Sequence, residues 1–250
     1  MAGRHELLLL VRNQLILAGY ELVEFNDSPD FCIYGGREEP VSPIVVPVLF
    51  LSSSKVYSAF DTKLNTLPKA LFNENSPLVV PSTMEVNTLE QATFIKNETS
   101  ILRLAAQVMI LRPFNVYGPT CDSVVAQFLE QAAANEPLDV HGNGYQVRAF
   151  LHENDFIDCV KKAVKRLLKR GQGIFNVGST EEITINRLAD SVLQLADKDL
   201  EVIRTYPPYH VDAWKLADTT RIKAFVRWQP KITIRQGIWR ALQNAEHSLV

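Results

Sequence analysis

Polar side chains gather at the ends of three apolar stretches of this sequence. "VLFL" leads into Ser52–Ser54, "VMIL" leads into Arg112–Tyr117, and "GIFNVG" leads into Ser179. Serine hydroxyls, an asparagine amide and an arginine guanidinium can all hydrogen-bond to the oxygens of a ligand. Because ligands in open α/β sheets bind beyond the carboxyl ends of the strands, the three clusters together predict one binding site. Each cluster alone is equally well explained as ordinary turn chemistry.

The elements needed to position these clusters alternate along the chain. Apolar runs that are too short for helices are separated by helical stretches, which indicates a parallel sheet covered on both faces. This order predicts a doubly wound α/β fold. We expect strands within residues 21–25, 30–36, 46–51, 108–114, 173–177 and 200–204. Helices are expected over 3–18, 84–106, 123–135, 153–169, 185–196 and near 234–245, and loops over 58–81 and 140–150.

Composition excludes several classes of protein. The net charge of −2, from 26 basic and 28 acidic side chains, gives no electrostatic footprint for nucleic acid or an anionic membrane. Cys32, Cys121 and Cys159 lack the paired spacing of a metal site or a disulfide framework, which favours a reducing compartment. Arg12 interrupts the apolar run Leu7–Val11 long before it reaches the length of a membrane span. We therefore expect a soluble, cytoplasmic protein without a metal.

Five stretches resemble, in this order, the successive motifs of one enzyme family. They are "LFLSSSKVYS", "MILRPFNVYGP", "VHGNGYQVRAFLHENDFIDCVKKAV", "GIFNVGSTEEITINRLAD" and "ADTTRIKAFVRWQPKITIRQGIWRAL". The family is that of the extended short-chain dehydrogenases, which are NAD-dependent sugar-nucleotide epimerases and dehydratases. The resemblance implies a Rossmann-like domain over 1–120, a region over 121–250 that completes the sheet and forms a small substrate lobe, and a nucleotide-diphosphate sugar as ligand.

The resemblance also gives individual residues a role. Asn115 is expected near the sugar diphosphate, where its amide can donate to a phosphate oxygen, and Arg148 matches the arginine that pairs with that diphosphate. Tyr117 belongs to the same substrate side, with packing favoured over catalysis. Ser53 matches the catalytic Ser/Thr that hydrogen-bonds the substrate. Lys55 stands where the dehydratases carry an acidic residue, and a desolvated lysine can act as a different base.

Two further matches are expected to be structural. His152 and Asp155 correspond to the family's "H..D" pair, and Asp155 is favoured as a helix cap. The stretch 219–228 resembles the family's closing element, which is expected to pack the substrate lobe.

The redox half of the family's site is poorly matched. Without a first strand and a glycine-rich turn, Gly3 is the only candidate glycine for the cofactor, and Asp27 is the candidate acidic residue, with a turn role favoured. Ser82 and Val86 stand where the family has its catalytic tyrosine and lysine. A serine hydroxyl is too weak an acid and valine carries no charge, so neither can do that chemistry. Pro208 replaces the second phosphate arginine.

Three hypotheses follow from these observations. The favoured one is a member of the family without NAD-dependent redox activity that binds a ligand or regulates a partner. The second is an enzyme of epimerase or dehydratase type that uses Ser53, Lys55 or Tyr117 in a non-standard site. The third is a structural subunit of a larger assembly. No cofactor is expected, with NAD or NADP implied by the resemblance only, and unpaired strand edges favour a homo-oligomer or a protein partner.

Overall fold

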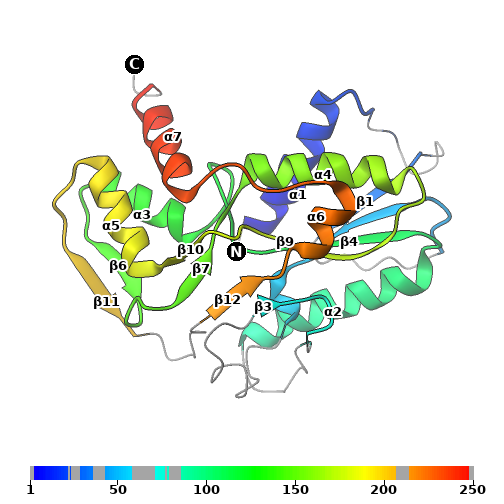
Figure 1. The fold of residues 1–250 in the computed structure, drawn as a ribbon, viewed down its shortest axis with the longest axis horizontal. Coiled ribbons are helices and arrows are strands. Elements are labelled where there is room, and N and C mark those ends of the chain that lie inside the picture. Colours follow the sequence, from blue (N-terminus) through cyan, green and yellow to red (C-terminus); the bar gives the residue numbers. More distant parts are fainter. Residues whose placement is uncertain are drawn as a thin grey trace.

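A four-stranded parallel sheet forms the centre of the computed structural model (Figure 1). The structure describes residues 3–21, 23, 29–35, 43–57, 71–76, 78, 86–206 and 214–247, with the backbone alone for 3–6, 86–90 and 245–247. The strands lie in the order β1-β2-β4-β9, and each neighbouring pair is parallel. Their bounds are Cys32–Gly35 for β1, Val48–Leu51 for β2, Val108–Pro113 for β4 and Gly173–Val177 for β9.

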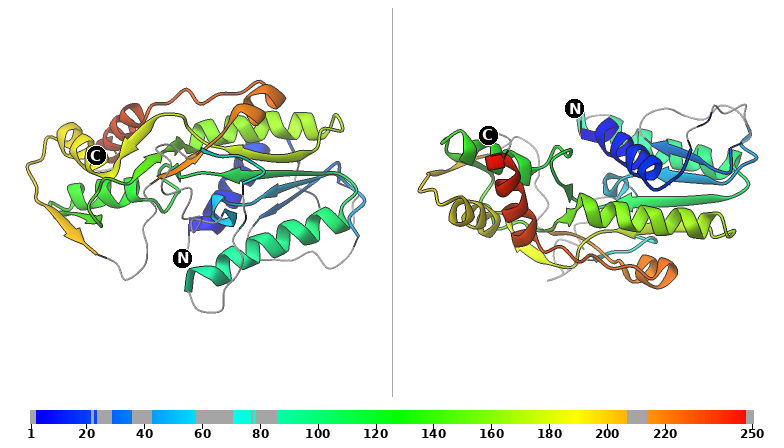
Figure 2. Two further views of the ribbon diagram at one scale, coloured as in Figure 1. Left: turned by 60° about the horizontal axis from the view of Figure 1, so that its bottom comes forward. Right: turned by 90° about the horizontal axis from the view of Figure 1, so that it is seen from above.

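Helices cover both faces of this sheet. Along β4, Met109 and Leu111 pack on the face that carries α1 (Gly3–Leu17) and α4 (Glu153–Leu167), whereas Val108 and Ile110 pack on the opposite face, with α2 (Val86–Leu104). This alternation follows from the two-residue period of a strand. Figure 2 shows α2 and α4 on opposite sides of the sheet. A sheet that is buried on both faces explains why its strands read as continuous apolar runs.

A second, smaller lobe lies beside the sheet, on the left in Figure 1. Its core is built from buried side chains such as Phe128, Leu188 and Ile238. These side chains come from α3 (Val124–Ala133), α5 (Ile185–Ala196) and α7 (Ile234–His247), which pack with the parallel pair β6 (Leu138–His141) and β11 (Val202–Thr205).

Short strands join the two regions. One small sheet has the order β10-β7-β12-β3, and β5 pairs with β8 in parallel. The bounds are Leu71–Phe72 for β3, Val116–Tyr117 for β5, Val147–Ala149 for β7, Leu151–His152 for β8, Glu182–Thr184 for β10 and Trp214–Ala217 for β12; α6 covers Thr220–Val226 and the short 3-10 helix η2 covers Ser54–Val56.

The fold confirms the predicted Rossmann-like α/β class, and the six expected helices end within two residues of the observed ones. The boundary at residue 120 stays a prediction. The loop expected over 140–150 is wrong, because β6 and β7 occupy parts of it and pair with strands distant in sequence. The strand expected at 21–25 is not seen at Glu21 or Val23, and the other three residues lie outside the described ones.

The element over 219–228 lies on the sheet side, contrary to expectation. α6 packs against α4 and β9, and Trp228 joins the same core cluster as those elements. The indole nitrogen of Trp228 donates to the carbonyl of Asp155 at 3.1 Å. This segment therefore supports the main sheet rather than the smaller lobe.

Candidate functional site

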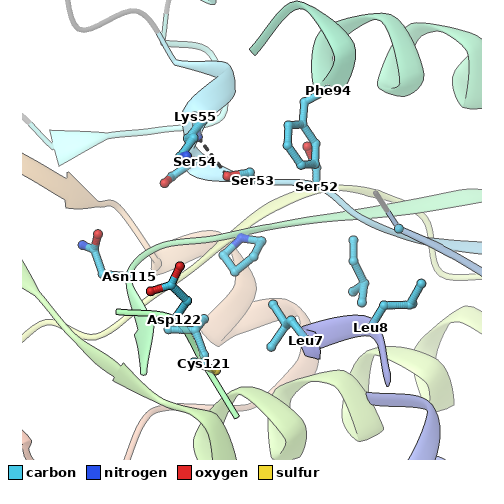
Figure 3. Close-up of a pocket in the computed structure, with 14 residues that line it drawn as sticks. Leu7, Leu8, Ser52, Ser53, Ser54, Lys55, Phe94, Asn115, Cys121 and Asp122 are labelled. Carbon is cyan, nitrogen blue, oxygen red and sulfur yellow. Dashed lines mark hydrogen bonds between the residues drawn. The ribbon is translucent and has the colours of Figure 1, made fainter. Parts of the chain in front are cut away.

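A cavity of about 220 Å³ opens at the carboxyl ends of β1, β2 and β4, where an α/β fold is expected to bind its ligands (Figure 3). On one side are the serines that follow β2 together with Lys55. On another side are Asn115 and the segment Cys121–Asp122, which follow β4. Leu7 and Leu8 of α1 form the apolar wall. Two of the polar clusters that the sequence placed at strand ends thus share one cavity.

The serine turn, residues Ser52–Tyr57, carries two of the predicted site residues. Ser53 precedes η2 as its N-cap, and its hydroxyl oxygen accepts a hydrogen bond from the backbone N–H of Lys55 at 3.2 Å (dashed in Figure 3). This bond satisfies one of the free donors at the start of the helix and fixes the side chain. Lys55 is exposed at the mouth of the cavity.

Asn115 stands at the opposite wall in a left-handed backbone conformation, with φ of 43°. Asparagine is one of the few residues that adopt this conformation at low cost. Its amide nitrogen donates to the carbonyl of Ala149 in β7 at 3.2 Å, which fixes the side chain at the edge of the cavity. One amide hydrogen is therefore committed to the fold, and the nitrogen has a second hydrogen to offer a ligand.

The wall formed by α1 lies where a family member would hold its NAD cofactor, and it can be compared with a glycine-rich turn. Methyl carbons of Leu8 lie 3.4 and 3.5 Å from the point that a Cβ at Gly35 would occupy. Proteins hold a dinucleotide at this edge of the sheet with backbone amides of a glycine-rich turn, whereas the described residues around this cavity present leucine side chains. The cavity is also smaller than the ~300–1,000 Å³ of a pocket for a drug-sized ligand.

The structure does not bring Tyr117 into this cavity. Tyr117 is buried in the smaller lobe, where its ring meets those of Phe150 and His152 edge to face. Its hydroxyl donates to the carbonyl of Thr233 at 3.4 Å. The residue lines a separate groove between α3 and α7. Its surroundings are those of a packing residue.

Arg148 lies in β7, next to the residue that accepts from Asn115. Its guanidinium donates to the carbonyl of Val147 at 2.8 Å, and it is not part of the wall of the cavity. Arg204, close in sequence to the position of the missing phosphate arginine, is bound to Asn143 and Asn186 of the smaller lobe. Of these two arginines, Arg148 lies on the strand that contacts the cavity wall.

Several positions singled out in the sequence fall outside this site or outside the described residues. Gly3 is the first residue of α1. Asp27, Ser82 and Pro208 lie outside the described residues, and only the backbone of Val86 is described, as the first residue of α2.

Asp155 does not cap its own helix, contrary to expectation. Its carboxylate accepts from the backbone N–H groups of Lys231 and Ile232 at 2.9 and 2.8 Å, so it anchors the segment before α7. The capping role belongs to His152, whose Nδ1 accepts from the backbone N–H of Asn154 at 3.1 Å. Burial lowers the pKa of His152, which keeps this nitrogen available as an acceptor.

Sequence reasoning missed part of the cavity wall. Cys121 and Asp122 follow the Tyr-Gly-Pro turn and could have been found as the continuation of a polar strand end. Phe94 and Leu8 come from the middle of helices, where nothing in the sequence marks a cavity wall. Within the described ranges, no group of three acidic, histidine or cysteine side chains is placed to hold a metal ion. Nor does any described helix have the length and apolarity needed to cross a membrane.

Comparison with known proteins matches residues 42–178 to the model of the NAD dependent epimerase/dehydratase family. UDP-glucuronic acid decarboxylase 4 of Arabidopsis thaliana is 35% identical over 139 residues, which are 53% of this chain and 30% of the plant protein. UDP-glucuronic acid decarboxylase 5 of the same plant is 26% identical over 196 residues, 76% of this chain. The chain spans 55% of the length of that relative.

Solved structures of similar fold extend over most of the chain. dTDP-glucose 4,6-dehydratase from Bacillus anthracis, in complex with NAD, superimposes with a TM-score of 0.67 and 20% identity, covering 81% of this chain and 62% of that one. UDP-glucuronic acid 4-epimerase from Bacillus cereus, in complex with UDP-glucuronic acid and NAD, has a TM-score of 0.66 and 19% identity, covering 82% and 62%. At these identities the likeness establishes the fold.

Proposed function

Because the chain belongs to the NAD dependent epimerase/dehydratase family, we propose that it binds a nucleotide-diphosphate sugar at the cavity and acts as a binding or regulatory protein without NAD-dependent redox chemistry. The observation that carries this proposal is that Ser53 and Asn115, two substrate-side residues of the resemblance, line one cavity. No tyrosine in the 250 residues is followed four positions later by a lysine. The binding half of the site is therefore better supported than the redox half.

The size of the cavity suggests which part of the ligand it holds. At about 220 Å³, it suits the sugar ring better than a whole sugar nucleotide. Hydroxyl groups of Ser53 and Ser54 and the amide of Asn115 can hydrogen-bond to sugar hydroxyls, while Leu7 and Leu8 cover an apolar face of the ring. The nucleotide and diphosphate would then lie outside the cavity.

Arg148 is the proposed contact for the diphosphate. Its neighbour Ala149 accepts a hydrogen bond from Asn115, so β7 runs beside the cavity wall. A guanidinium fork can pair with two phosphate oxygens. With one arginine assigned to it, the diphosphate would be bound more weakly than by a pair.

Binding of UDP-glucuronic acid, the ligand held by the Bacillus cereus epimerase, tests the proposal. In isothermal titration calorimetry we expect saturable binding of UDP-glucuronic acid, no binding of NAD at cellular concentrations, and weaker binding in Arg148→Ala. Arg187→Ala, an exposed arginine on α5, is the matched control and should bind as the wild type does. Absence of binding across UDP-, dTDP-, GDP- and CDP-sugars would reject the proposal, and tight binding of NAD would reject its second half.

A second function is favoured by the position of Lys55. This lysine and Ser53 line the same cavity as Asp122, so a base, a hydroxyl and a carboxylate face one space. On this alternative the protein converts a sugar nucleotide by a non-standard site. Proton NMR of UDP-glucuronic acid incubated with the protein would detect turnover, and turnover that persists in Ser53→Ala/Lys55→Ala would exclude these residues as the catalysts.

A further inference from the structure

A buried polar network lies behind the serine turn. The guanidinium of Arg112 donates to both carboxylate oxygens of Glu98 at 2.9 and 2.6 Å, and to the hydroxyl of Tyr57 at 2.9 Å. That hydroxyl in turn donates to the side-chain oxygen of Asn176 at 2.7 Å. The four residues are between 0% and 4% exposed. We refer to Glu98, Arg112, Tyr57 and Asn176 as the Arg112 network.

The network does not line the cavity, and its groups keep one protonation state near neutral pH. Burial lowers the pKa of Arg112, but the hydrogen bonds and charge of Glu98 outweigh this effect and raise it, so the guanidinium stays charged. Burial raises the pKa of Tyr57, so the phenol stays protonated. None of the four side chains lines the cavity. The guanidinium therefore remains a donor, and the phenol keeps the proton that it donates to Asn176.

The serine turn is attached to β4 at both of its ends. At the start, the backbone N–H of Ser52 donates to the carbonyl of Leu111 at 2.8 Å. At the end, the hydroxyl of Tyr57 is held by Arg112, the next residue of β4. Asn115 follows shortly after on the same segment. Strand β4 therefore holds the serine turn, which forms one wall of the cavity, and leads into Asn115 on the opposite wall.

We propose that Arg112 and Tyr57 are positioning residues, through which β4 holds Ser53 and Lys55 at a fixed distance from Asn115. A turn of six residues that is anchored only at its start can rotate about that anchor. At its far end the turn is also held by the bridge of Tyr57 to Leu78 and by the packing of the Tyr57 ring. The hydrogen bond from Arg112 adds a directional anchor there, which helps to preorganise the cavity. The network also links the turn to α2 through Glu98 and to the edge strand β9 through Asn176, so the wall is tied both to the sheet and to a helix that covers it.

A network of this kind can also serve stability alone, and the two roles can be separated. Replacing a whole buried ion pair by apolar side chains of similar volume often preserves stability, whereas removing one partner does not. Glu98→Met/Arg112→Met/Tyr57→Phe therefore removes the second anchor while filling the space. Tyr57→Phe alone removes one oxygen atom and serves as the variant that folds if the triple variant does not.

Hydrogen exchange measures the anchoring without any ligand. The backbone N–H groups of Val56 and Tyr57 donate to the carbonyls of Ser53 and Ser54 at 3.2 and 3.3 Å. We expect their exchange to become about five- to tenfold faster in the triple variant and in Tyr57→Phe, while amides of α5 keep their rates. Ile222→Val, a buried substitution in α6, controls for a general loss of stability. Unchanged protection of both amides in a folded variant overturns the proposal.

Ligand affinity gives the second readout, and this arm rests on the proposed function. In calorimetry with UDP-glucuronic acid we expect about tenfold weaker binding in the triple variant, with Ile222→Val at wild-type affinity. Wild-type affinity in the triple variant overturns the positioning role. If the wild-type protein binds no sugar nucleotide, the proposed function fails, and the exchange experiment still decides whether the network holds the serine turn.

Discussion

Two Val-Tyr dipeptides end in buried tyrosines that have different surroundings. In the sheet region, the hydroxyl of Tyr57 makes hydrogen bonds of 2.7 and 2.9 Å to Asn176 and Arg112. In the smaller lobe, the hydroxyl of Tyr117 makes one hydrogen bond of 3.4 Å to a backbone carbonyl and packs among apolar side chains. The same local sequence thus supplies a member of a charged network in one region and a core residue in the other.

The difference shows that a shared dipeptide does not imply a shared role. Burial raises the pKa of both phenols. For Tyr57, Arg112 opposes this effect, whereas for Tyr117 the charges of Glu181 and Asp155 add to it. In both positions burial therefore favours the neutral phenol over the phenolate. What distinguishes them is the set of polar groups that each hydroxyl must satisfy.

The largest expected effect comes from removing the charge beside Tyr57. Arg112→Met leaves the carboxylate of Glu98 buried without its partner and should lower the free energy of unfolding by ~3–5 kcal/mol. Urea denaturation followed by circular dichroism measures this loss. Adding Glu98→Met to the same chain should recover much of it. A single variant as stable as the wild type would show that water or another group satisfies Glu98.

In the smaller lobe, the hydroxyl of Tyr117 leaves no space for a side chain at position 237. A Cβ added to Gly237 would lie directly against that hydroxyl, so Gly237→Ala should destabilise the protein by ~1–3 kcal/mol. The double variant Gly237→Ala/Tyr117→Phe should be more stable than Gly237→Ala alone, because the closest clashing atom is gone and only the ring carbons, at 2.7 and 2.8 Å, must still shift. Thermal unfolding of the four proteins completes this cycle, and strict additivity of the two changes would contradict it.

Removing each phenol oxygen tests the comparison directly. Tyr57→Phe removes the acceptor of one Arg112 hydrogen bond and the donor to the side-chain oxygen of Asn176, and it should cost ~1–3 kcal/mol. Tyr117→Phe removes one long hydrogen bond and should cost ~0.5 kcal/mol. Urea midpoints of the two variants, measured side by side, give the difference. Equal losses would mean that the Arg112 network contributes nothing beyond packing.

The smallest effect on the free energy of unfolding is expected from a change of pH, which acts through His152, the histidine beside Tyr117. Burial lowers the pKa of His152, so the unfolded chain binds a proton more readily than the folded one. Its contribution is present above the ordinary histidine pKa of about 6.5 and is lost as the pH falls below it. The facing charges are Glu153 and Asp155, which raise the pKa, and Arg240, which lowers it.

His152→Asn keeps a side-chain oxygen that can cap α4 and removes the titrating group. Between about pH 7.5 and about pH 5.5, the free energy of unfolding should fall more steeply in the wild type than in this variant. Parallel slopes would mean that His152 takes up its proton equally in both states.

The sequence predicted the elements whose signals are local. Helices such as α5 carry a 3.6-residue apolar period and a capping threonine, and β2 and β4 are short runs of large apolar residues. The strands β6 and β7 were not predicted because each pairs with strands distant in sequence and lies next to turn residues around Gly142 and Gly144. The apolar periodicity of a segment carries no information about which distant strand it pairs with.

The cavity was predictable only in part, for the same reason. Ser53 and Asn115 follow strands of one sheet, and that fact alone places them at one edge. The contribution of Leu8 depends on where α1 lies across the sheet, which no local pattern specifies. The role of Arg112 depends on two partners from separate parts of the chain, Glu98 and Tyr57, so its position at a polar strand end suggested a ligand site rather than a buried network.

The left-handed backbone of Asn115 has a consequence for the design of experiments. An alanine at this position would carry a Cβ in a conformation that disfavours it, so a loss of binding in Asn115→Ala would mix backbone strain with the loss of the amide. Glycine tolerates the same φ, so Asn115→Gly removes the side chain without that strain. Mutational scanning of this cavity should therefore use glycine as the reference at position 115 and alanine elsewhere.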